Sequence, residues 1–133
     1  MITKKKHSLL FICLGNICRS PAAEGVMKAK VHECGLDSEF FIDSAGIGDW
    51  HVGQLPDSRM RDRGARRGYR FDSHARQIRQ SDFDDFDLLL VMDKANYKAV
   101  TAQASSEEAR SKVRMLTDYL VEHSGTDVVP DPY

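Results

Sequence analysis

The stretch Leu9-Leu10-Phe11-Ile12-Cys13-Leu14-Gly15-Asn16-Ile17-Cys18-Arg19-Ser20-Pro21 decides the fold of this chain. An apolar run typical of a buried strand ends at Cys13, five residues separate Cys13 from Arg19, and Pro21 suits the first turn of a helix. Gly15 and Asn16 can adopt the positive φ angles that a tight loop requires. The backbone amides of such a loop turn inward and can hold a tetrahedral oxyanion. The stretch therefore predicts a strand, an anion-binding loop and a helix in succession.

The same loop carries the groups needed for attack of sulfur on phosphorus. Cys13 would lie beneath the bound anion as a thiolate, and Arg19 would grip two of its oxygens with its planar guanidinium. The residues of the predicted phosphate-binding loop are Leu14, Gly15, Asn16, Ile17 and Cys18. The loop spacing alone is a weak signal, and the structural alternative is a strand-to-helix turn that contains a buried cysteine.

The composition is that of one globular domain of 133 residues, with 41% hydrophobic and 29% charged residues. A net charge of −1 gives no global attraction to nucleic acid or to anionic membranes, so neither is expected as a partner. Three cysteines, an odd number, argue against a secreted disulfide framework and favour a cytoplasmic location. No stretch approaches membrane-spanning length, and the basic residues before Leu9 lack the long apolar run and cleavage site of a signal peptide.

Strand-like and helix-like segments alternate along the chain. Strands are expected at 8–13, 39–44, 87–92 and 112–116, with the very apolar 87–92 segment in the centre of a sheet. Helices are expected from Pro21 to Cys34, with Gly35 ending the first one, then at 56–67, at 94–104 and from 105 onward. This order predicts a doubly wound α/β sheet whose ligand binds at the carboxyl ends of the strands, where Cys13 lies.

Over essentially its whole length the chain resembles the low-molecular-weight protein tyrosine phosphatases. The matching segments are Cys13–Pro21, Ser44-Ala45-Gly46, Trp50-His51-Val52-Gly53, Pro56-Asp57, His74-Ala75-Arg76-Gln77, Phe86–Asp93 and Asp131-Pro132-Tyr133. The resemblance implies a four-stranded parallel sheet with helices on both faces. It also implies hydrolysis of phosphotyrosine in proteins through a phosphocysteine, with no metal or other cofactor and with tyrosine-phosphorylated proteins as partners. We further expect a monomer.

The resemblance also implies a role for individual residues. Cys13 matches the nucleophile, Arg19 matches the group that binds the phosphoryl oxygens, and Ser20 matches the hydroxyl that bonds to the cysteine sulfur. Asp131 matches the general acid, which protonates the tyrosyl oxygen and then activates water. The supporting network of the loop matches Asn16, Ser44 and His74, and the aromatic walls of the substrate cleft match Trp50 and Tyr133. Asp93 fits a structural role as well as a functional one.

One departure from the family concerns the end of the sequence. Family members usually continue past the position of Tyr133 with a second aromatic residue, a glycine-rich turn and a last amphipathic helix. Residues 1–133 are therefore expected to form a single phosphatase domain that lacks this C-terminal helix.

Three alternatives share the loop or the fold. A phosphoarginine phosphatase is disfavoured because Ile17 and Trp50 present apolar surface that suits a phenyl ring better than a guanidinium. An arsenate reductase would need further cysteines, and residues 70–95 contain none. A phosphotyrosine-binding module without turnover would be expected to have lost Cys13, Arg19 or Asp131, and all three are present.

Two further patterns have a bearing on partners and regulation. The 59–70 segment carries six arginines, but Asp57, Asp62 and the acidic residues at 82–87 could balance them and no base-stacking motif accompanies them, so nucleic acid is not expected. Cys18 lies five positions after Cys13 in a tight loop, within plausible reach of a disulfide. Because a reactive thiolate is also the form that peroxide oxidises, redox regulation is expected.

Overall fold

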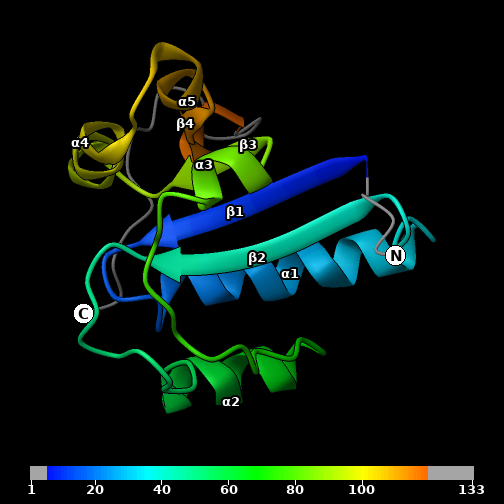
Figure 1. The fold of residues 1–133 in the computed structure, drawn as a ribbon. Coiled ribbons are helices and arrows are strands. Elements are labelled where there is room, and N and C mark those ends of the chain that lie inside the picture. Colours follow the sequence, from blue (N-terminus) through cyan, green and yellow to red (C-terminus); the bar gives the residue numbers. More distant parts are fainter. Residues whose placement is uncertain (1–5, 120–133) are drawn as a thin grey trace.

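The computed structural model describes residues 6–119, and its centre is a four-stranded parallel sheet (Figure 1). The strands lie in the order β2-β1-β3-β4, with β1 next to both β2 and β3. Their bounds are His7–Cys13 for β1, Phe40–Gly46 for β2, Leu88–Val91 for β3 and Val113–Met115 for β4. The predicted parallel α/β sheet is confirmed, including a central β3 and β4 at the edge.

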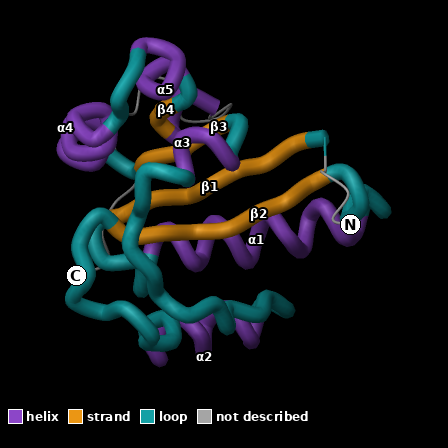
Figure 2. Tube along the Cα trace, in the orientation of Figure 1, coloured by secondary structure: helices purple, strands orange, loops and turns teal. Residues whose placement is uncertain are grey.

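The helices connect consecutive strands, as Figure 2 shows for the described part of the chain. Their bounds are Arg19–Glu33 for α1, Ser58–Arg66 for α2, Asp82–Asp85 for α3, Lys94–Gln103 for α4 and Glu107–Ser111 for α5, followed by a 3₁₀ turn at Leu116–Tyr119. The short helix α3 was not predicted, because four residues are too few to reveal a helical period. None of these helices is long and apolar enough to cross a membrane.

Alternate residues of β1 supply the two faces of the sheet. Leu10 and Ile12 belong to a core cluster that includes Phe83 of α3, Val100 of α4 and Ala109 of α5. On the opposite face the cluster contains Phe11, Cys13, Ile42, Leu90, Met92 and Val31 of α1. Helices therefore cover both faces, as predicted (Figure 1), and Cys13 lies on the face that α1 covers.

Side chains placed just before the helices fix where they begin. Asp57 accepts a hydrogen bond from the Met60 amide at the start of α2, Asp93 accepts one from the Asn96 amide, and Ser106 accepts one from the Ala109 amide. Gly35 ends α1 with a φ of 69° that favours glycine. Helix α1 ends at Glu33, one residue before the predicted end, and Cys34 is its exposed C-cap residue.

Helix α2 packs on α1 with the ring of Phe71 between them. A Cβ atom placed on Gly25 of α1 would lie 2.3 Å from the Phe71 ring, and one on Gly64 of α2 would also lie 2.3 Å from it. Only glycine fits at either position, and Phe71 is 8% exposed as a result. The two helices are thus held together by one aromatic side chain that enters a space left by two missing side chains.

Candidate active site

The candidate site lies where β1 ends and α1 begins, at the carboxyl edge of the sheet. A cavity of about 170 Å³ opens there, which is smaller than the roughly 300–1,000 Å³ of most cofactor and drug pockets. The residues that line it are Cys13, Leu14, Gly15, Ile17, Cys18, Arg19, Trp50 and His51. The structure therefore brings the predicted nucleophile, loop, arginine and one aromatic wall together around a space suited to a small anionic group.

The sulfur of Cys13 is buried and held by two donors. The Ser20 hydroxyl oxygen lies 3.0 Å from Cys13 Sγ, and the Asn16 amide donates to the same sulfur at 3.3 Å. Cys13 is 4% exposed and Ser20 is fully buried. These two contacts hold the sulfur in place within the loop.

The direction of the Ser20 hydrogen follows from Asn16. The Arg76 backbone amide can only donate, and it donates to Asn16 Oδ1 at 3.0 Å, which fixes which end of the Asn16 side chain is the oxygen. Asn16 Nδ2 then donates to Ser20 Oγ at 2.8 Å and to Ser44 Oγ at 2.9 Å. Having accepted this bond, the Ser20 hydroxyl keeps its own hydrogen for Cys13 Sγ.

Asn16 also adopts a conformation that shapes the loop. Its φ of 58° makes it the one non-glycine residue in the left-handed region among residues 6–119. Gly46 at the end of β2 allows the loop to approach, because a Cβ there would lie 3.1 Å from Asn16 Cβ. The loop therefore packs closely against β2 and is hydrogen-bonded to it through the 2.9 Å contact from Asn16 to Ser44.

Glu24 of α1 is part of this network, and the sequence analysis missed it. Ser44 Oγ donates to Glu24 Oε1 at 2.5 Å, and Lys28 Nζ lies 2.5 Å from Glu24 Oε2. Glu24 is only 3% exposed, which is unusual for a glutamate side chain. The sequence feature that could have indicated Glu24 is its position one turn after Ser20, among the small and apolar core-facing residues of the first helix.

Arg19 is positioned by Asp93, a residue for which the sequence left both a structural and a functional role open. Arg19 Nη1 lies 3.1 Å from Asp93 Oδ2, and the Arg19 side chain is 9% exposed. Asp93 follows β3, whose last residue Val91 pairs with Ile12 of β1. Adjacent parallel strands end at the same edge of the sheet, so the residue after β3 lies near the loop after β1. Asp93 can therefore both cap α4 and bind the Arg19 side chain that lines the cavity.

A buried ion-pair cluster behind the loop holds the segment that contacts Asn16. Arg76 donates through both terminal nitrogens to the Asp82 carboxylate at 3.1 Å and through Nε to Asp43 at 3.1 Å. Burial alone would lower the pKa of Arg76, but the hydrogen bond with Asp82 and the charges of Asp43 and Asp82 raise it above its usual value. Arg76 therefore stays charged throughout the physiological pH range.

This cluster corrects one expectation. Asp82, part of the acidic run expected to balance the arginines of α2, is fully buried and pairs with Arg76 and Arg79 instead. Asp87 turns to β1, where its carboxylate accepts the Ser8 amide at 2.9 Å. The arginines of α2 are therefore not neutralised by this run.

Trp50 and His51 form one wall of the cavity. Trp50 is 65% exposed, and its ring lies over Gly48, where a Cβ would lie 1.8 Å from it. His51 Nδ1 is 3.1 Å from Gln54 Oε1, and its ring lies 3.0 Å from where a Gly15 Cβ would be. Trp50 was predicted as a wall, whereas His51 was not singled out although it follows Trp50 in the same glycine-rich loop.

Three predicted site residues are not brought to the cavity by the described part of the chain. His74 is exposed and makes no hydrogen bond with the loop within residues 6–119, whereas the Arg76 amide, two residues further along, donates to Asn16 Oδ1. Asp131 and Tyr133 lie outside the described residues. Within residues 6–119 no three His, Cys, Asp or Glu side chains are grouped as metal ligands would be.

A buried cysteine sulfur with hydroxyl and amide donors, facing an anchored arginine across a small cavity, can attack a phosphorus atom and hold its oxygens. On a parallel α/β sheet, with the loop after the first strand, this geometry defines a cysteine-dependent phosphatase.

Comparison with known proteins gives the family. The family model for low molecular weight phosphotyrosine protein phosphatase matches residues 8–133. The low molecular weight protein-tyrosine-phosphatase YfkJ of Bacillus subtilis is 42% identical over 127 residues, which cover 95% of this chain and 80% of YfkJ. A crystal structure of a protein tyrosine phosphatase from Entamoeba histolytica superposes with a TM-score of 0.90 at 44% identity, covering 96% of this chain and 80% of the other. The chain belongs to the low molecular weight phosphotyrosine protein phosphatase family.

Proposed function

We propose that the protein hydrolyses phosphotyrosine in proteins through a phosphocysteine intermediate, without a metal ion. The observation that carries this proposal is the Cys13 sulfur, held by the Ser20 hydroxyl and the Asn16 amide in a cavity that Arg19 also lines. Family membership supports the same reaction.

In the first step the Cys13 thiolate attacks phosphorus and the bond from phosphorus to the tyrosyl oxygen breaks. Arg19, held by Asp93, binds two phosphoryl oxygens and stabilises the charge that grows on them. Asp131 gives its proton to the departing tyrosyl oxygen, so that the leaving group departs as a neutral phenol.

In the second step water replaces the sulfur on phosphorus. Asp131, now a carboxylate, takes a proton from the water as its oxygen bonds to phosphorus. The phosphorus–sulfur bond breaks, and the Ser20 hydroxyl donates to the leaving thiolate, since its hydrogen is free to point there. Inorganic phosphate leaves, and Cys13 returns to its starting state.

The cavity walls support an aryl phosphate as substrate. Ile17 and Trp50 line the opening with apolar surface, which favours a phenyl ring over the charged guanidinium of phosphoarginine. Tyrosine-phosphorylated proteins are therefore the proposed substrates. The three free cysteines of the described chain support a reducing compartment, the cytoplasm, as the proposed place of action.

The test compares Cys13→Ser with Cys34→Ser, a matched change at an exposed cysteine outside the site. Cys13→Ser should abolish hydrolysis of a phosphotyrosyl peptide, because a neutral hydroxyl is a much weaker nucleophile and the Ser20 and Asn16 groups that contact this position in the described chain are donors, not bases. Cys34→Ser should retain full activity. Phosphoserine, phosphoarginine and arsenate are offered to the same preparation, with and without EDTA. Activity that survives Cys13→Ser, or that EDTA removes, would overturn the mechanism.

A further inference from the structure

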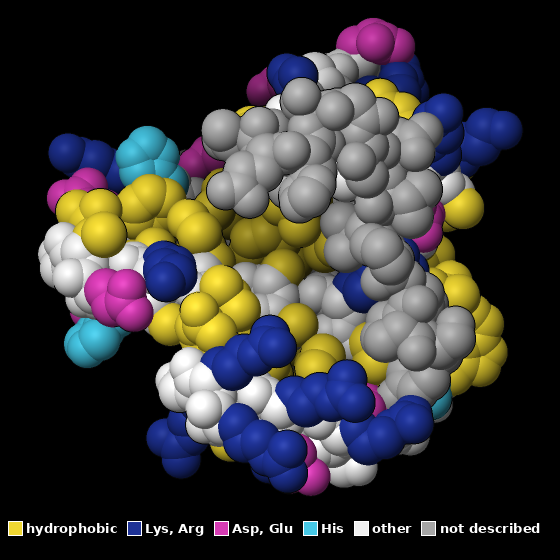
Figure 3. All heavy atoms as spheres, turned by 180° about the vertical axis from the view of Figure 1, so that it is seen from behind, with side chains coloured by type: hydrophobic (Ala, Val, Ile, Leu, Met, Phe, Trp, Pro, Cys, Tyr) yellow, Lys and Arg dark blue, Asp and Glu magenta, His cyan; other side chains and the backbone are white. Residues whose placement is uncertain are grey.

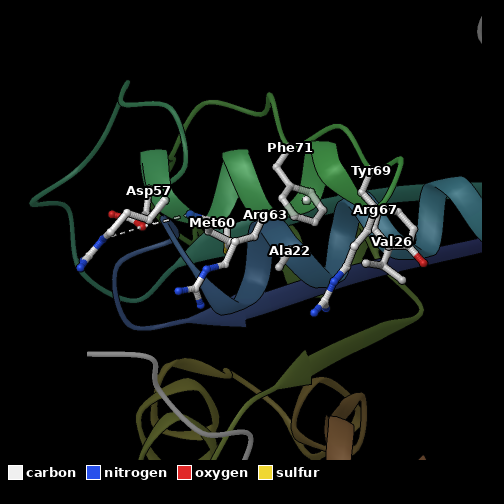
Figure 4. Close-up of a pocket in the computed structure, with 10 residues that line it drawn as sticks. Ala22, Val26, Asp57, Met60, Arg63, Arg67, Tyr69 and Phe71 are labelled. Carbon is white, nitrogen blue, oxygen red and sulfur yellow. Dashed lines mark hydrogen bonds and ion pairs between the residues drawn. The ribbon is translucent and has the colours of Figure 1, made fainter.

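A second and larger cavity lies between α1 and α2, outside the catalytic cavity. Its volume is about 400 Å³. The residues that line it are Ala22, Val26, Asp57, Arg59, Met60, Arg63, Gly64, Arg67, Tyr69 and Phe71. We call this cavity the α1/α2 groove. Its floor is apolar, from Ala22, Val26, Met60 and Phe71, and its rim on α2 is basic (Figure 4).

The arginines of the rim are spaced regularly. Arg59, Arg63 and Arg67 are four residues apart, so they lie on one face of α2 at intervals of about 6 Å along its axis. Figure 4 shows Arg63 and Arg67 extending in the same direction over the α1 side of the groove. The side chains of alternate residues in an extended peptide share one side at a similar interval, roughly 6.6–6.8 Å. A row of acidic side chains on such a peptide would therefore match the row of arginines.

Two of the three rim arginines have no acidic partner among the described residues. Arg59 lies 3.7 Å from Asp57, whereas Arg63 and Arg67 form no ion pair with any residue of 6–119. Figure 3 shows Lys and Arg side chains gathered over the part of the surface where α2 lies. Because the whole protein carries a net charge of only −1, this is a local positive surface.

The groove starts beside the catalytic loop. The Asp57 amide donates to the Ile17 carbonyl at 2.8 Å, and Ile17 lines the catalytic cavity while Asp57 lines the groove. Arg59 is the rim arginine nearest Asp57 in the chain, and Arg67 ends the row about 12 Å further along the helix axis. Four residues of extended peptide cover that length.

We propose that the α1/α2 groove binds an acidic segment next to the phosphotyrosine of a protein substrate, with one apolar side chain of that segment on the floor. The proposal rests on the proposed function, since the phosphotyrosine itself occupies the catalytic cavity. It makes Arg63 and Arg67 specificity-determining residues, because they contact the flanking segment and not the reacting phosphorus.

The experiment measures kcat and KM for p-nitrophenyl phosphate and for three phosphotyrosyl peptides. One peptide has neutral flanks, one has acidic residues at alternate positions before the phosphotyrosine, and one has them after it. At low salt one acidic peptide should have a KM about 3- to 10-fold below that of the neutral peptide, with little change in kcat. The difference should shrink as salt is raised.

Charge reversal separates the groove from the general charge of the protein. Arg63→Glu and Arg67→Glu should remove the preference for the acidic peptide and leave p-nitrophenyl phosphate hydrolysis unchanged. Arg66→Glu is the matched control, because Arg66 is exposed on the same helix and does not line the groove. It changes the net charge equally and should keep the preference.

Three outcomes would overturn the proposal. The first is that all peptides have equal KM values. The second is that Arg66→Glu loses the preference for the acidic peptide as fully as Arg63→Glu and Arg67→Glu do. The third comes from a parallel assay of binding to phosphatidylserine vesicles, in which Arg63→Glu loses vesicle binding but keeps the peptide preference. Failure of the proposed function would differ from all of these, since no phosphotyrosyl peptide would then be hydrolysed.

Discussion

Asn16 combines a left-handed backbone with three hydrogen bonds, to Ser20, to Ser44 and from the Arg76 amide. Asn16→Gly keeps the backbone freedom but removes the side chain, while Asn16→Ala removes both. We expect kcat to fall about 10²-fold in each, because the Ser20 hydrogen is no longer directed at the sulfur. Steady-state kinetics with p-nitrophenyl phosphate measure this loss.

Stability should separate the two Asn16 variants. The alanine has to adopt a φ that costs about 1–3 kcal/mol, a cost that glycine does not carry. Urea denaturation should therefore place Asn16→Ala below Asn16→Gly. Full kcat in Asn16→Gly would mean that the side-chain amide has no part in orienting Ser20.

Asp131 lies outside the described residues, but its proposed role as general acid can be tested with substrates whose leaving groups differ in acidity. Asp131→Asn should lower kcat for phosphotyrosine by about 10²–10⁴-fold, since a proton is no longer supplied to the tyrosyl oxygen. The loss should be smaller for p-nitrophenyl phosphate, whose leaving group is already acidic. Equal losses on both substrates would mean that Asp131 is not the general acid.

Cys18 shares the catalytic cavity with Cys13, and both are buried and form no disulfide within residues 6–119. We expect peroxide to inactivate the enzyme and dithiothreitol to restore it through a Cys13–Cys18 disulfide. Cys18→Ser should keep its basal activity but recover poorly, because the sulfur is oxidised further. Cys34→Ser should recover like the unmodified protein. Peptide mapping that finds no Cys13–Cys18 crosslink would contradict this prediction.

The residues of the loop could be predicted from the sequence because they are consecutive, whereas their partners come from distant segments. Ser44 and His74 were both expected in the supporting network through the resemblance, but His74 is exposed, and the backbone amide of Arg76 contacts Asn16. Glu24 was missed because a helical pattern marks apolar core positions and gives no reason for a buried carboxylate there. Its partner Ser44 is 20 residues away and becomes a neighbour only in the fold.

Among the elements, the four-residue helix α3 helps to hold the catalytic loop in place. Its Asp82 holds Arg76, whose backbone contacts the loop. Asp82→Ala leaves a partly exposed arginine with Asp43 as its remaining carboxylate, and losing one partner in this way costs about 1–3 kcal/mol. Urea denaturation should show the loss of stability, and kcat should fall with it because the Arg76 segment is no longer fixed.

Asp84→Ala is the control for this change, since Asp84 is exposed on the same helix. An exposed site of this kind should change the stability by no more than about 0.5 kcal/mol. If Asp82→Ala is equally mild, the buried cluster does not stabilise the fold.

The longer elements were predictable for a physical reason that α3 lacks. The strands β1 and β3 are buried on both faces and appear as continuous apolar runs, and the ends of α1 and α2 carry Gly35 and Asp57, whose chemistry is local. The packing of α2 on α1 was not predictable, because it depends on Phe71 meeting Gly25 and Gly64 from three separate segments.

For the whole molecule, the bond between the Arg76 amide and Asn16 spans 60 residues of sequence, and it has a consequence for synthesis. At about 5–20 residues per second the ribosome needs roughly 3–12 s to extend the chain from Asn16 to Arg76. Cys13 is therefore made early, but the loop around it gains its contact with the Arg76 amide only after Arg76 has been translated. Throughout that interval Asn16 lacks the partner that fixes its side chain, so the hydrogen bonds that hold the Cys13 sulfur, and the catalytic power that depends on them, arise only after Arg76 has been added.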